Sequence, residues 1–363
     1  MDLPARAEID DTIKIVRDHA DRIFTWNYER ERPKLVTLYN KATEAQWSGV
    51  NDLDWATEVD LEWLVADMGD EAVPTFIRAA KDVPGSPIAS WTEKEFTVLG
   101  IELLKARLSQ FVHGEQGALL CTAKIVETVP WIDAKYYAAT QVMDEARHVE
   151  VFARYLDTKV GDHYPISPFL DEQLTALIED SRWDIAYLGM QIIIESLALA
   201  AFGQLHRSTS EPLLKKLLRY VMSDEARHVA FGILSLGELY GDLSSAELLE
   251  RQEFLFENTG RSRARATTPE VWERMGVDLP ALMSAIQQTN DPGTHGIFSE
   301  FQRQFFSKLV PNVRKLGLLD ANDGWLRERW GQTGLLEFEN GDDTSADYGT
   351  YDAVTADRGS PAN

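Results

Sequence analysis

The hexapeptide Asp-Glu-Ala-Arg-His-Val occurs twice in this chain of 363 residues, at positions 144–149 and 224–229. In each copy a glutamate precedes a histidine by three residues, and side chains at that spacing lie on one face of an α-helix. One helical turn can therefore offer a metal ion a carboxylate oxygen and an imidazole nitrogen. A further glutamate stands 30 residues before each pair (145 − 115 and 225 − 195). The candidate metal ligands are Glu115, Glu145, His148, Glu195, Glu225 and His228.

The last three ligands repeat the first three with every position shifted by 80 (195 − 115, 225 − 145, 228 − 148). A dinuclear site in a four-helix bundle uses such a set: one Glu from each of two helices and a Glu-x-x-His pair from each of the other two. An isolated pair of this kind is more often a pair of surface ions. Because an identical second copy is present, metal binding becomes the better explanation of these pairs. Glu195 strengthens the metal interpretation, because it lies in an apolar run where an unpaired carboxylate is costly to bury.

The residues beside the ligands indicate a supporting layer. A metal-bound imidazole usually donates its second N–H to a carboxylate, which fixes the orientation of the ring. We expect Asp144 and Asp224 each to bind the histidine of the opposite helix, and Arg147 and Arg227 to hold these aspartates. The alternative is that all four are ordinary ions on a helix surface, although such a surface has little reason to repeat four residue types in one order.

Four long helices must position the ligands. Periodic apolar positions and helix breakers predict a helix over about 90–130 that carries the first glutamate ligand, and a second over about 131–158 with the first Glu-x-x-His pair. A third predicted helix, over about 171–206, carries Glu195. A fourth begins at about residue 210 and carries the second pair.

Helices are also predicted on both sides of this bundle. Apolar residues at helical spacing continue over about 8–48 with a break at Pro33, and three or four more helices are expected within 246–330. Over residues 336–363 Gly, Asp, Ser and Thr dominate without periodicity, which predicts a disordered acidic tail.

Composition narrows the class of protein. Cys121 is the single cysteine, which excludes an intrachain disulfide and a cysteine-built metal site. The formal charge of −23 argues against nucleic acid and anionic membranes as partners, because both bind basic surfaces. Neither an uninterrupted apolar run of membrane-spanning length nor a signal-peptide core occurs, so we expect a cytoplasmic protein. The sequence thus predicts an all-α protein, with a four-helix bundle at about 90–240 inside one domain of residues 1–335.

The two Asp-Glu-x-Arg-His strings with an upstream Glu on separate helices resemble the ferritin-like dinuclear iron oxygenases. In motif they are most similar to the hydroxylase subunits of bacterial multicomponent monooxygenases. The resemblance covers about residues 90–240 and implies a ferritin-like bundle with additional N- and C-terminal helices. It also implies that the first three ligands hold one iron and the last three the other, with some carboxylates bridging. Iron in both positions is favoured, and a manganese–iron pair is compatible with the same ligands.

Residues that mark individual branches of this superfamily are replaced here. The radical Tyr of the ribonucleotide reductase small subunit corresponds to Phe152, the extra His of the arylamine N-oxygenases to Val221, and a Thr of the multicomponent hydroxylases to Leu199. What remains resembles a stand-alone member with a mainly apolar face toward the site, which suits a dry substrate pocket. The candidates for that face are Phe111, Thr122, Phe152, Leu188, Gln191, Ile192, Leu199 and Val221. Gln191 is the candidate for a polar contact to substrate or bound oxygen, with core packing as its alternative role.

The resemblance implies an O2-dependent oxidation of a small organic substrate, with hydroxylation expected and electrons from an external donor. N-oxygenation and desaturation on the same scaffold are alternatives, as are a ferroxidase and a radical-generating subunit. Ferroxidases of this kind are usually near half this length, and Phe152 cannot carry a tyrosyl radical. A homodimer is common among such relatives, by analogy only. The sequence leaves the substrate, the electron donor and the oligomeric state open.

Overall fold

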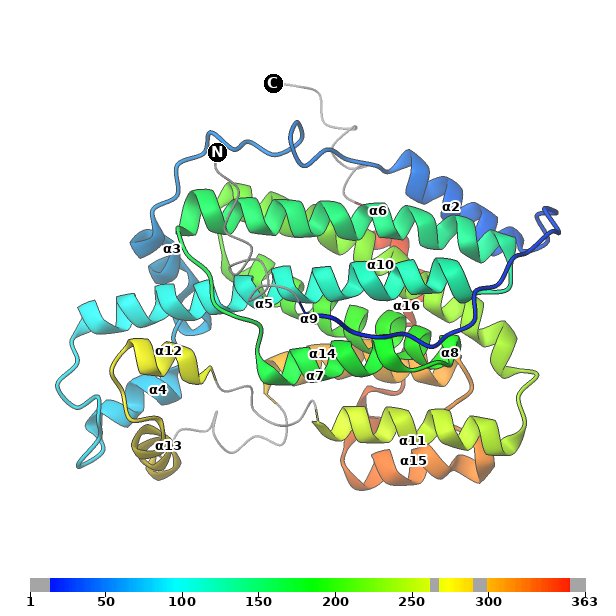
Figure 1. Cartoon of the computed structure of the whole chain (residues 1–363). Helices are drawn as coiled ribbons and strands as arrows, with labels where there is room; N and C mark the ends of the chain where they lie inside the picture. The colour runs from blue at the N-terminus through cyan, green and yellow to red at the C-terminus, as the bar shows by residue number, and fades with distance from the viewer. Residues whose placement is uncertain (1–13, 262–267, 290–298, 353–363) are drawn as a thin grey trace.

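The computed structural model describes residues 14–261, 268–289 and 299–352 (Figure 1). Within these ranges all regular secondary structure is helical. Long helices lie side by side at the centre and shorter helices surround them (Figure 1). The predicted all-α class is confirmed.

Four segments form the central bundle and carry the six candidate ligands. α5 and α6 form one antiparallel hairpin, and α9 and α10 form a second that packs against it (Figure 1). The bounds are α5 Glu93–Thr128, α6 Ile132–Tyr155, the π-helical η4 Leu188–Ile194 continuing into α9 Glu195–Ser208, and α10 Pro212–Tyr240.

Local signals determine where two of these helices begin. Thr92 precedes α5 in a capping box, in which its backbone N–H donates to the Glu95 carboxylate at 2.7 Å. Before α10, the Glu211 carboxylate accepts hydrogen bonds from the backbone N–H groups of Leu213 and Leu214 at 2.8 and 2.6 Å. The helices predicted to begin near residues 90 and 210 are therefore present close to their predicted positions.

The third predicted helix, over 171–206, is wrong as a single element. The chain first forms α7 (Pro168–Glu179), breaks, and starts again as α8 (Trp183–Tyr187), which runs on into η4. At the break the Asp180 carboxylate accepts from the backbone N–H of Arg182 at 2.9 Å. This local side-chain-to-backbone bond competes with continuation of the helix.

The predicted helix over 8–48 is wrong in its described part before residue 33. Residues 14–32 have no regular secondary structure, and the helix is limited to α2 (Pro33–Glu44). The segment runs along the outside of the bundle (Figure 1) and bonds to the end of α5, with the backbone N–H of Ile23 donating to the carbonyl of Glu127 at 2.8 Å. Such tertiary contacts replace the hydrogen bonds of a helix. The part of the prediction before residue 14 lies outside the described residues.

The remaining helices cover the bundle. α3, α4, α12 and α13 gather around the first turns of α5, α11 and α15 lie side by side toward the opposite end, and α14 packs against α9 (Figure 1). Five helices, α11 to α15, occupy the described part of 246–330, where three or four were expected. The bounds are α3 Leu61–Met68, η1 Gly69–Glu71, α4 Thr75–Ala79, η2 Ala80–Asp82, η3 Leu156–Val160, α11 Ser245–Arg261, α12 Pro269–Arg274, α13 Leu279–Gln288, α14 Glu300–Lys315 and α15 Ala321–Gln332.

One stretch of the described chain, Trp183–Ser208, is long and apolar enough to cross a membrane. It is also a core element of the bundle: 78% of its most apolar window is buried, and it carries Glu195. Buried core helices pass the same test of length and composition, so the stretch is weak evidence for a membrane.

The prediction of a disordered tail over 336–363 is wrong for the part that the structure describes. The backbone N–H of Thr344 donates to Asn312 Oδ1 at 2.9 Å, and the Arg327 guanidinium donates to both carboxylate oxygens of Glu339 at 2.8 and 2.7 Å. These contacts depend on partners in other helices, so local composition gave no signal of them. Residues from 353 on lie outside the described ranges. The ordered elements are η6 Leu335–Phe338, α16 Thr344–Asp347 and η7 Tyr348–Tyr351.

Truncation after Leu335 is therefore expected to lower the midpoint of thermal unfolding by roughly 5 °C or more. The deletion removes Thr344, which bonds to Asn312, and Glu339, which pairs with Arg327, and it uncovers part of α10. Differential scanning calorimetry measures the shift. As a control, Glu337→Gln breaks only an exposed ion pair with Arg303 and is expected to change the midpoint by less than about 1 °C. An unchanged midpoint in the truncated chain would contradict this account of the C-terminal segment.

Candidate metal centre

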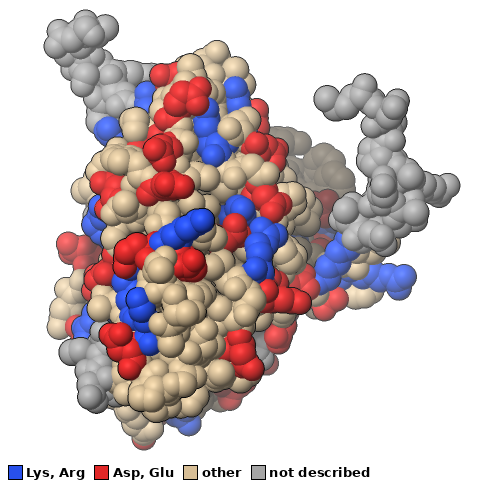
Figure 2. All heavy atoms as spheres, turned by 90° about the vertical axis from the view of Figure 1, so that its left-hand side faces the viewer, with Lys and Arg blue, Asp and Glu red and all other residues tan. Residues whose placement is uncertain are grey.

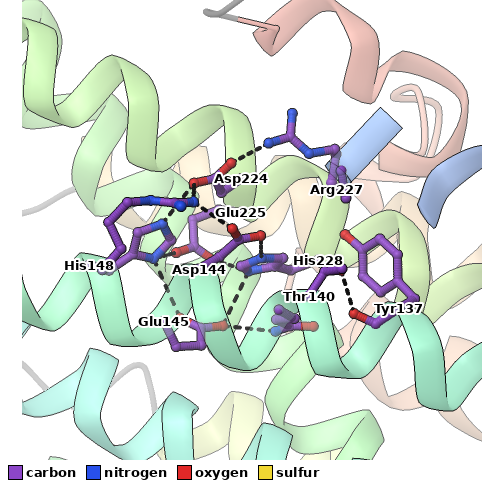
Figure 3. Close-up of polar contacts among 12 residues, drawn as sticks. Tyr137, Thr140, Asp144, Glu145, His148, Asp224, Glu225, Arg227 and His228 are labelled. Atoms are coloured by element: carbon purple, nitrogen blue, oxygen red, sulfur yellow. Dashed lines mark hydrogen bonds and ion pairs between the residues drawn. The ribbon is translucent and has the colours of Figure 1, made fainter. Parts of the chain in front are cut away.

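The structure brings all six predicted ligands together in the middle of the bundle, where Figure 3 shows the four from α6 and α10 facing one another. They form two groups, and in each group one potential ligand atom per residue lies within 4.8 Å of the others. Glu145 and Glu225, the glutamates of the repeated hexapeptide, belong to both groups. Glu115 and His148 complete the first group. The second is completed by Glu195 and His228.

The cluster is buried. Both histidines and the two shared glutamates have no exposed surface, and Glu195 and Glu115 are 2% and 5% exposed. Four glutamates in one buried cluster need compensating cations or protons. Two divalent ions would balance their charge. Glu145 Oε2 also has no hydrogen-bond partner among the described residues, which leaves it available to a metal.

Each histidine directs one ring nitrogen into the cluster and the other out of it. The Nδ1 atoms of His148 and His228 both lie 3.1 Å from carboxylate oxygens of Glu225. Separations of about 3 Å suit neighbouring ligand atoms on an ion with bonds of about 2.1 Å. The Nε2 atoms lie 3.1 Å from Asp224 Oδ2 for His148 and 3.4 Å from Asp144 Oδ2 for His228. Each aspartate therefore lies beside the histidine of the opposite helix.

The two predicted arginines hold these aspartates, and Figure 3 shows Arg227 beside Asp224. Arg147 donates to Asp144 Oδ1 at 2.5 Å and to Asp224 Oδ2 at 3.1 Å, and thereby joins the two halves of the repeat. Arg227 donates to Asp224 Oδ1. The supporting layer is thus electrically balanced, with two carboxylates and two guanidinium groups.

Two residues of this layer were missed by sequence reasoning. Gln46 and Trp47 follow α2, at the end of the segment 8–48 that the sequence predicts to be helical. Gln46 Nε2 donates to Asp144 Oδ1 at 2.9 Å, and Trp47 Nε1 donates to Asp224 Oδ2 at 2.7 Å. Neighbouring residues of one segment therefore hold both aspartates. No local pattern connects them to partners so distant in the chain.

Gln141 was also missed. It is buried on α6, one turn before Glu145, and its Nε2 donates to Glu145 Oε1 at 2.8 Å and to Glu195 Oε1 at 3.1 Å. The spacing of four residues from a predicted ligand is a signal that could have identified it.

The residues predicted to face a substrate pocket separate into two kinds. Phe152, Leu199 and Val221 are buried in the apolar core, and Phe111 packs against Phe152 with ring centroids 5.5 Å apart. Leu188 and Ile192 are buried there too. Thr122 and Gln191 are instead fully buried polar side chains, and within the described residues neither has a hydrogen-bond partner for its side chain.

The electrostatics of the metal-free cluster favour protonation of the outer glutamates and both histidines. Burial, followed by repulsion from Glu225, raises the pKa values of Glu115 and Glu195 well above the ordinary range. Burial alone would lower the histidine pKa values, but the surrounding carboxylates outweigh it: the pKa of His148 lies well above its usual value and that of His228 rises to about 10. The pKa of Glu225 is held below its usual range by a hydrogen bond from Glu195 and by the charge of His228, against the effect of burial.

Metal binding is therefore expected to release protons and to strengthen as pH rises. A ligand must be deprotonated to bind a metal, and burial and the neighbouring carboxylates raise the pKa values of Glu115, Glu195 and both histidines when the metal is absent. The apparent metal affinity therefore increases with pH, by about tenfold per pH unit for each proton released. Calorimetric titration of Fe²⁺ without O2, in buffers of different ionisation enthalpy, counts the protons. Fewer than two protons per chain, or affinity that falls with pH between 6 and 8, would contradict this charge distribution.

A four-helix bundle that buries two groups of ligands, with two glutamates common to both groups, is typical of a dinuclear metal protein. Solved structures with a similar fold include R2-like ligand-binding oxidases named with a Mn/Fe cofactor. One variant, anaerobically reconstituted, is 18% identical with a TM-score of 0.44, and the match covers 80% of this chain and 93% of that one. Another structure, aerobically reconstituted, is 17% identical with a TM-score of 0.43 and coverage of 87% and 96%.

No family model and no curated protein matches the chain. A likeness as distant as that to the oxidases does not establish what this chain does. The function therefore has to be inferred from the six ligands and their surroundings.

Proposed function

We propose that this chain is a dinuclear-metal oxidase that uses O2 to oxidise, by hydroxylation, a small organic substrate, with electrons from an external donor. The observation that carries the proposal is the sharing of Glu145 and Glu225 between two ligand groups. Shared carboxylates would hold two ions next to each other, as O2 activation by a metal pair requires. Carboxylates with two imidazoles favour iron in both positions, with a manganese–iron pair as the alternative.

The protein's own contribution is orientation and exclusion of water. The bound metal pair would supply the redox chemistry. Asp224 and Asp144 accept hydrogen bonds from the Nε2 side of the histidine rings, so the Nδ1 atoms are the ones that would bind the metal ions. Arg147 and Arg227 hold both aspartates in place through hydrogen bonds. The absence of exposed surface at both histidines keeps bulk water from the reacting atoms.

The same features disfavour the two rival functions. A ferroxidase needs a hydrated route along which iron passes, whereas the shared glutamates and both histidines are fully buried. A radical subunit needs an oxidisable Tyr beside the metals, and that position is Phe152. Tyr155, one turn further, donates its hydroxyl to Glu211 at 3.0 Å, where Glu211 caps α10, so this tyrosine supports a helix start.

The surface is consistent with small-molecule chemistry as opposed to nucleic-acid binding. Figure 2 shows acidic side chains interspersed with basic ones on one face of the molecule, without a continuous basic area there. Together with the charge of −23, this supports a cytoplasmic enzyme whose partners are O2, an organic substrate and an electron donor.

The direct test is a reaction of the full chain loaded anaerobically with Fe²⁺, reduced, and exposed to isotopically labelled O2 with a panel of small organic compounds. We expect the protein to retain both irons and to place one labelled oxygen atom in the product, detected by mass spectrometry. Catalytic oxidation of many irons per chain would favour the ferroxidase. A lasting tyrosyl signal in electron paramagnetic resonance would favour the radical subunit. Metal-free protein and Glu225→Ala serve as controls, and neither should form product.

A further inference from the structure

The two ends of the metal site differ, although the sequence repeat relates one to the other. A shift of 80 positions relates Phe111 to Gln191 (191 − 111) and Gln141 to Val221 (221 − 141). The same shift relates Thr122 to Phe202 (202 − 122). At each of these three places the repeat pairs a polar side chain with an apolar one.

The polar members lie at one end of the site. Glu115 of α5 contacts His148 of α6, so in these antiparallel helices Thr122 and Gln141, each seven positions away (122 − 115 and 148 − 141), lie at the same level. Gln141 donates to Glu195 of the second hairpin at 3.1 Å.

Gln191 reaches this end from the second hairpin. It precedes Glu195 by four positions and faces Gly232 of α10, where an added Cβ would lie only 2.5 Å from the Cβ of Gln191. The glycine leaves the room that Gln191 occupies. The shift of 80 positions relates Gly232 to Phe152 (232 − 152), which lies at the opposite end of the site. We call the end with Thr122, Gln141 and Gln191 the amide end.

The opposite end is filled by the protein itself. Phe111 lies edge-on to Phe202 with ring centroids 4.7 Å apart, and Phe152 packs on both rings at 5.5 Å. Val221 is fully buried in the same apolar cluster. We call this the phenylalanine end. A ligand there would have to displace three packed aromatic rings.

The amide end is polar and its hydrogen bonds are incomplete. Thr122, Gln141 and Gln191 have no exposed surface. Yet Thr122 Oγ1, Gln141 Oε1 and both amide atoms of Gln191 have no hydrogen-bond partner among the described residues. Buried polar atoms are almost always paired in native proteins, so such a set indicates a bound group that supplies the partners.

The chemistry of Gln141 restricts that group. Its nitrogen must face the Glu145 and Glu195 carboxylates, because only N–H can donate to them, so its oxygen faces away as a pure acceptor. The bound group must therefore donate a hydrogen bond, and a carboxylate cannot. Charge agrees, since the ligand glutamates balance two divalent ions and the two aspartates of the supporting layer balance Arg147 and Arg227. No surplus positive charge remains to attract an anion.

We propose that the amide end binds the head group of the substrate, and that this head group is neutral and both donates and accepts hydrogen bonds, as a primary amide or a hydroxyl does. This inference rests on the proposed oxidase function in one respect, namely that the bound molecule is called the substrate. The binding site follows from the unpartnered atoms. Carboxylic acids, which ionise at neutral pH, are excluded as substrates that bind through this end.

Isothermal titration calorimetry of the metal-loaded chain without O2 tests the proposal with three probes of similar shape: butyramide, butyrate and methyl butyrate. Butyramide donates and is neutral, butyrate is charged, and the ester is neutral without a donor. We expect butyramide to bind at least tenfold more tightly than the other two. Equal or tighter binding of butyrate or the ester, or no binding of butyramide, would overturn the proposal.

The repeat supplies a matched control. Gln191→Leu should weaken butyramide binding at least tenfold, whereas Phe111→Leu, at the related position of the phenylalanine end, should leave it within about twofold. Equal losses in both variants would show that the site does not distinguish its ends and would overturn the assignment.

Thermal unfolding without any probe gives a second readout. Gln191→Leu removes an unpaired buried amide and should maintain or raise the unfolding midpoint, whereas Gln141→Leu removes bonds to two carboxylates and should lower it. A clear fall in the Gln191→Leu midpoint would assign that residue a purely structural role. None of these measurements uses O2, so the two proposals can fail separately. If the probes bind as expected but no substrate is oxidised, only the oxidase function is refuted. If a substrate is oxidised but the probes do not bind as expected, only this inference is refuted.

Discussion

Replacement of Glu225 with alanine is expected to abolish the binding of both metal ions, whereas Glu115→Ala should remove only one. Glu225 belongs to both ligand groups and Glu115 to the first alone. The two carboxylate oxygens of Glu225 each lie 3.1 Å from the Nδ1 atom of a different histidine, so this side chain links the two ligand groups. Inductively coupled plasma mass spectrometry of protein produced with ample iron should report near zero, one and two ions per chain for Glu225→Ala, Glu115→Ala and wild type.

Two further variants make this comparison decisive. Glu225→Gln keeps the volume of the side chain and should lose metal in the same way, which separates ligand loss from a packing defect. Glu102→Gln changes a carboxylate of α5 that pairs with Lys105 away from the site, and should keep the full complement. Retention of both ions in Glu225→Ala would refute the assignment of the ligands. Near-stoichiometric zinc in the wild type would refute the assignment of iron as the bound metal.

The second large effect is expected at the supporting aspartates, with Asp224→Asn more damaging than Asp144→Asn. Loss of either charge should cost roughly 10–100-fold in metal affinity or activity, because the imidazole loses the partner that orients it. Asp224 accepts from His148 at 3.1 Å and from Trp47 at 2.7 Å, whereas the contact between Asp144 and His228 is longer, at 3.4 Å. Burial opposes ionisation of Asp224, yet the charge of Arg227 and the bond with His148 hold its pKa below the usual range.

Competition with a chromophoric chelator measures the affinities of these variants. Asp171→Asn is the control, because it removes an exposed carboxylate whose partner is Lys14 and should leave metal affinity unchanged. Wild-type affinity in both Asp224→Asn and Asp144→Asn would show that the aspartates neither orient nor polarise the histidines.

The gathering of the ligands and the pairing of aspartates with histidines could be predicted because the evidence is repeated in the sequence. One Glu-x-x-His pair has many explanations, but a second copy at a constant shift of 80, with Glu115 and Glu195 obeying the same shift, has few. Helical spacing then places Asp144 and Asp224 beside their ligands. These are local relations along a helix, which a sequence records directly.

The parts that could not be predicted depend on tertiary contacts. Residues 14–32 show helical spacing of apolar side chains, yet they bond to the end of α5 in an irregular conformation. The C-terminal residues to 352 are acidic and aperiodic, yet Asn312 and Arg327 hold them on the bundle. Trp47 lies in the loop after α2, and its partner Asp224 is 177 positions away.

The pocket prediction shows a different limit. Sequence reasoning grouped Phe111, Phe152, Val221 and Gln191 on one face, because all stand one turn from a ligand. Spacing along each helix places a residue near the site but does not tell toward which end of the bundle it lies. That requires the antiparallel register of the helices, which the structure supplies.

The bonds from Gln46 and Trp47 to the two aspartates also bear on how quickly the site exchanges its metal. Both residues follow α2, a helix of 12 residues that buries only Leu35, Leu38 and Ala42. An element with so few buried side chains can detach by local opening while the central bundle stays folded. Each detachment removes one donor from both aspartates and so loosens both histidines together. We therefore expect the off-rate of the metal pair to follow the opening rate of this one short helix, which hydrogen exchange in α2 measures.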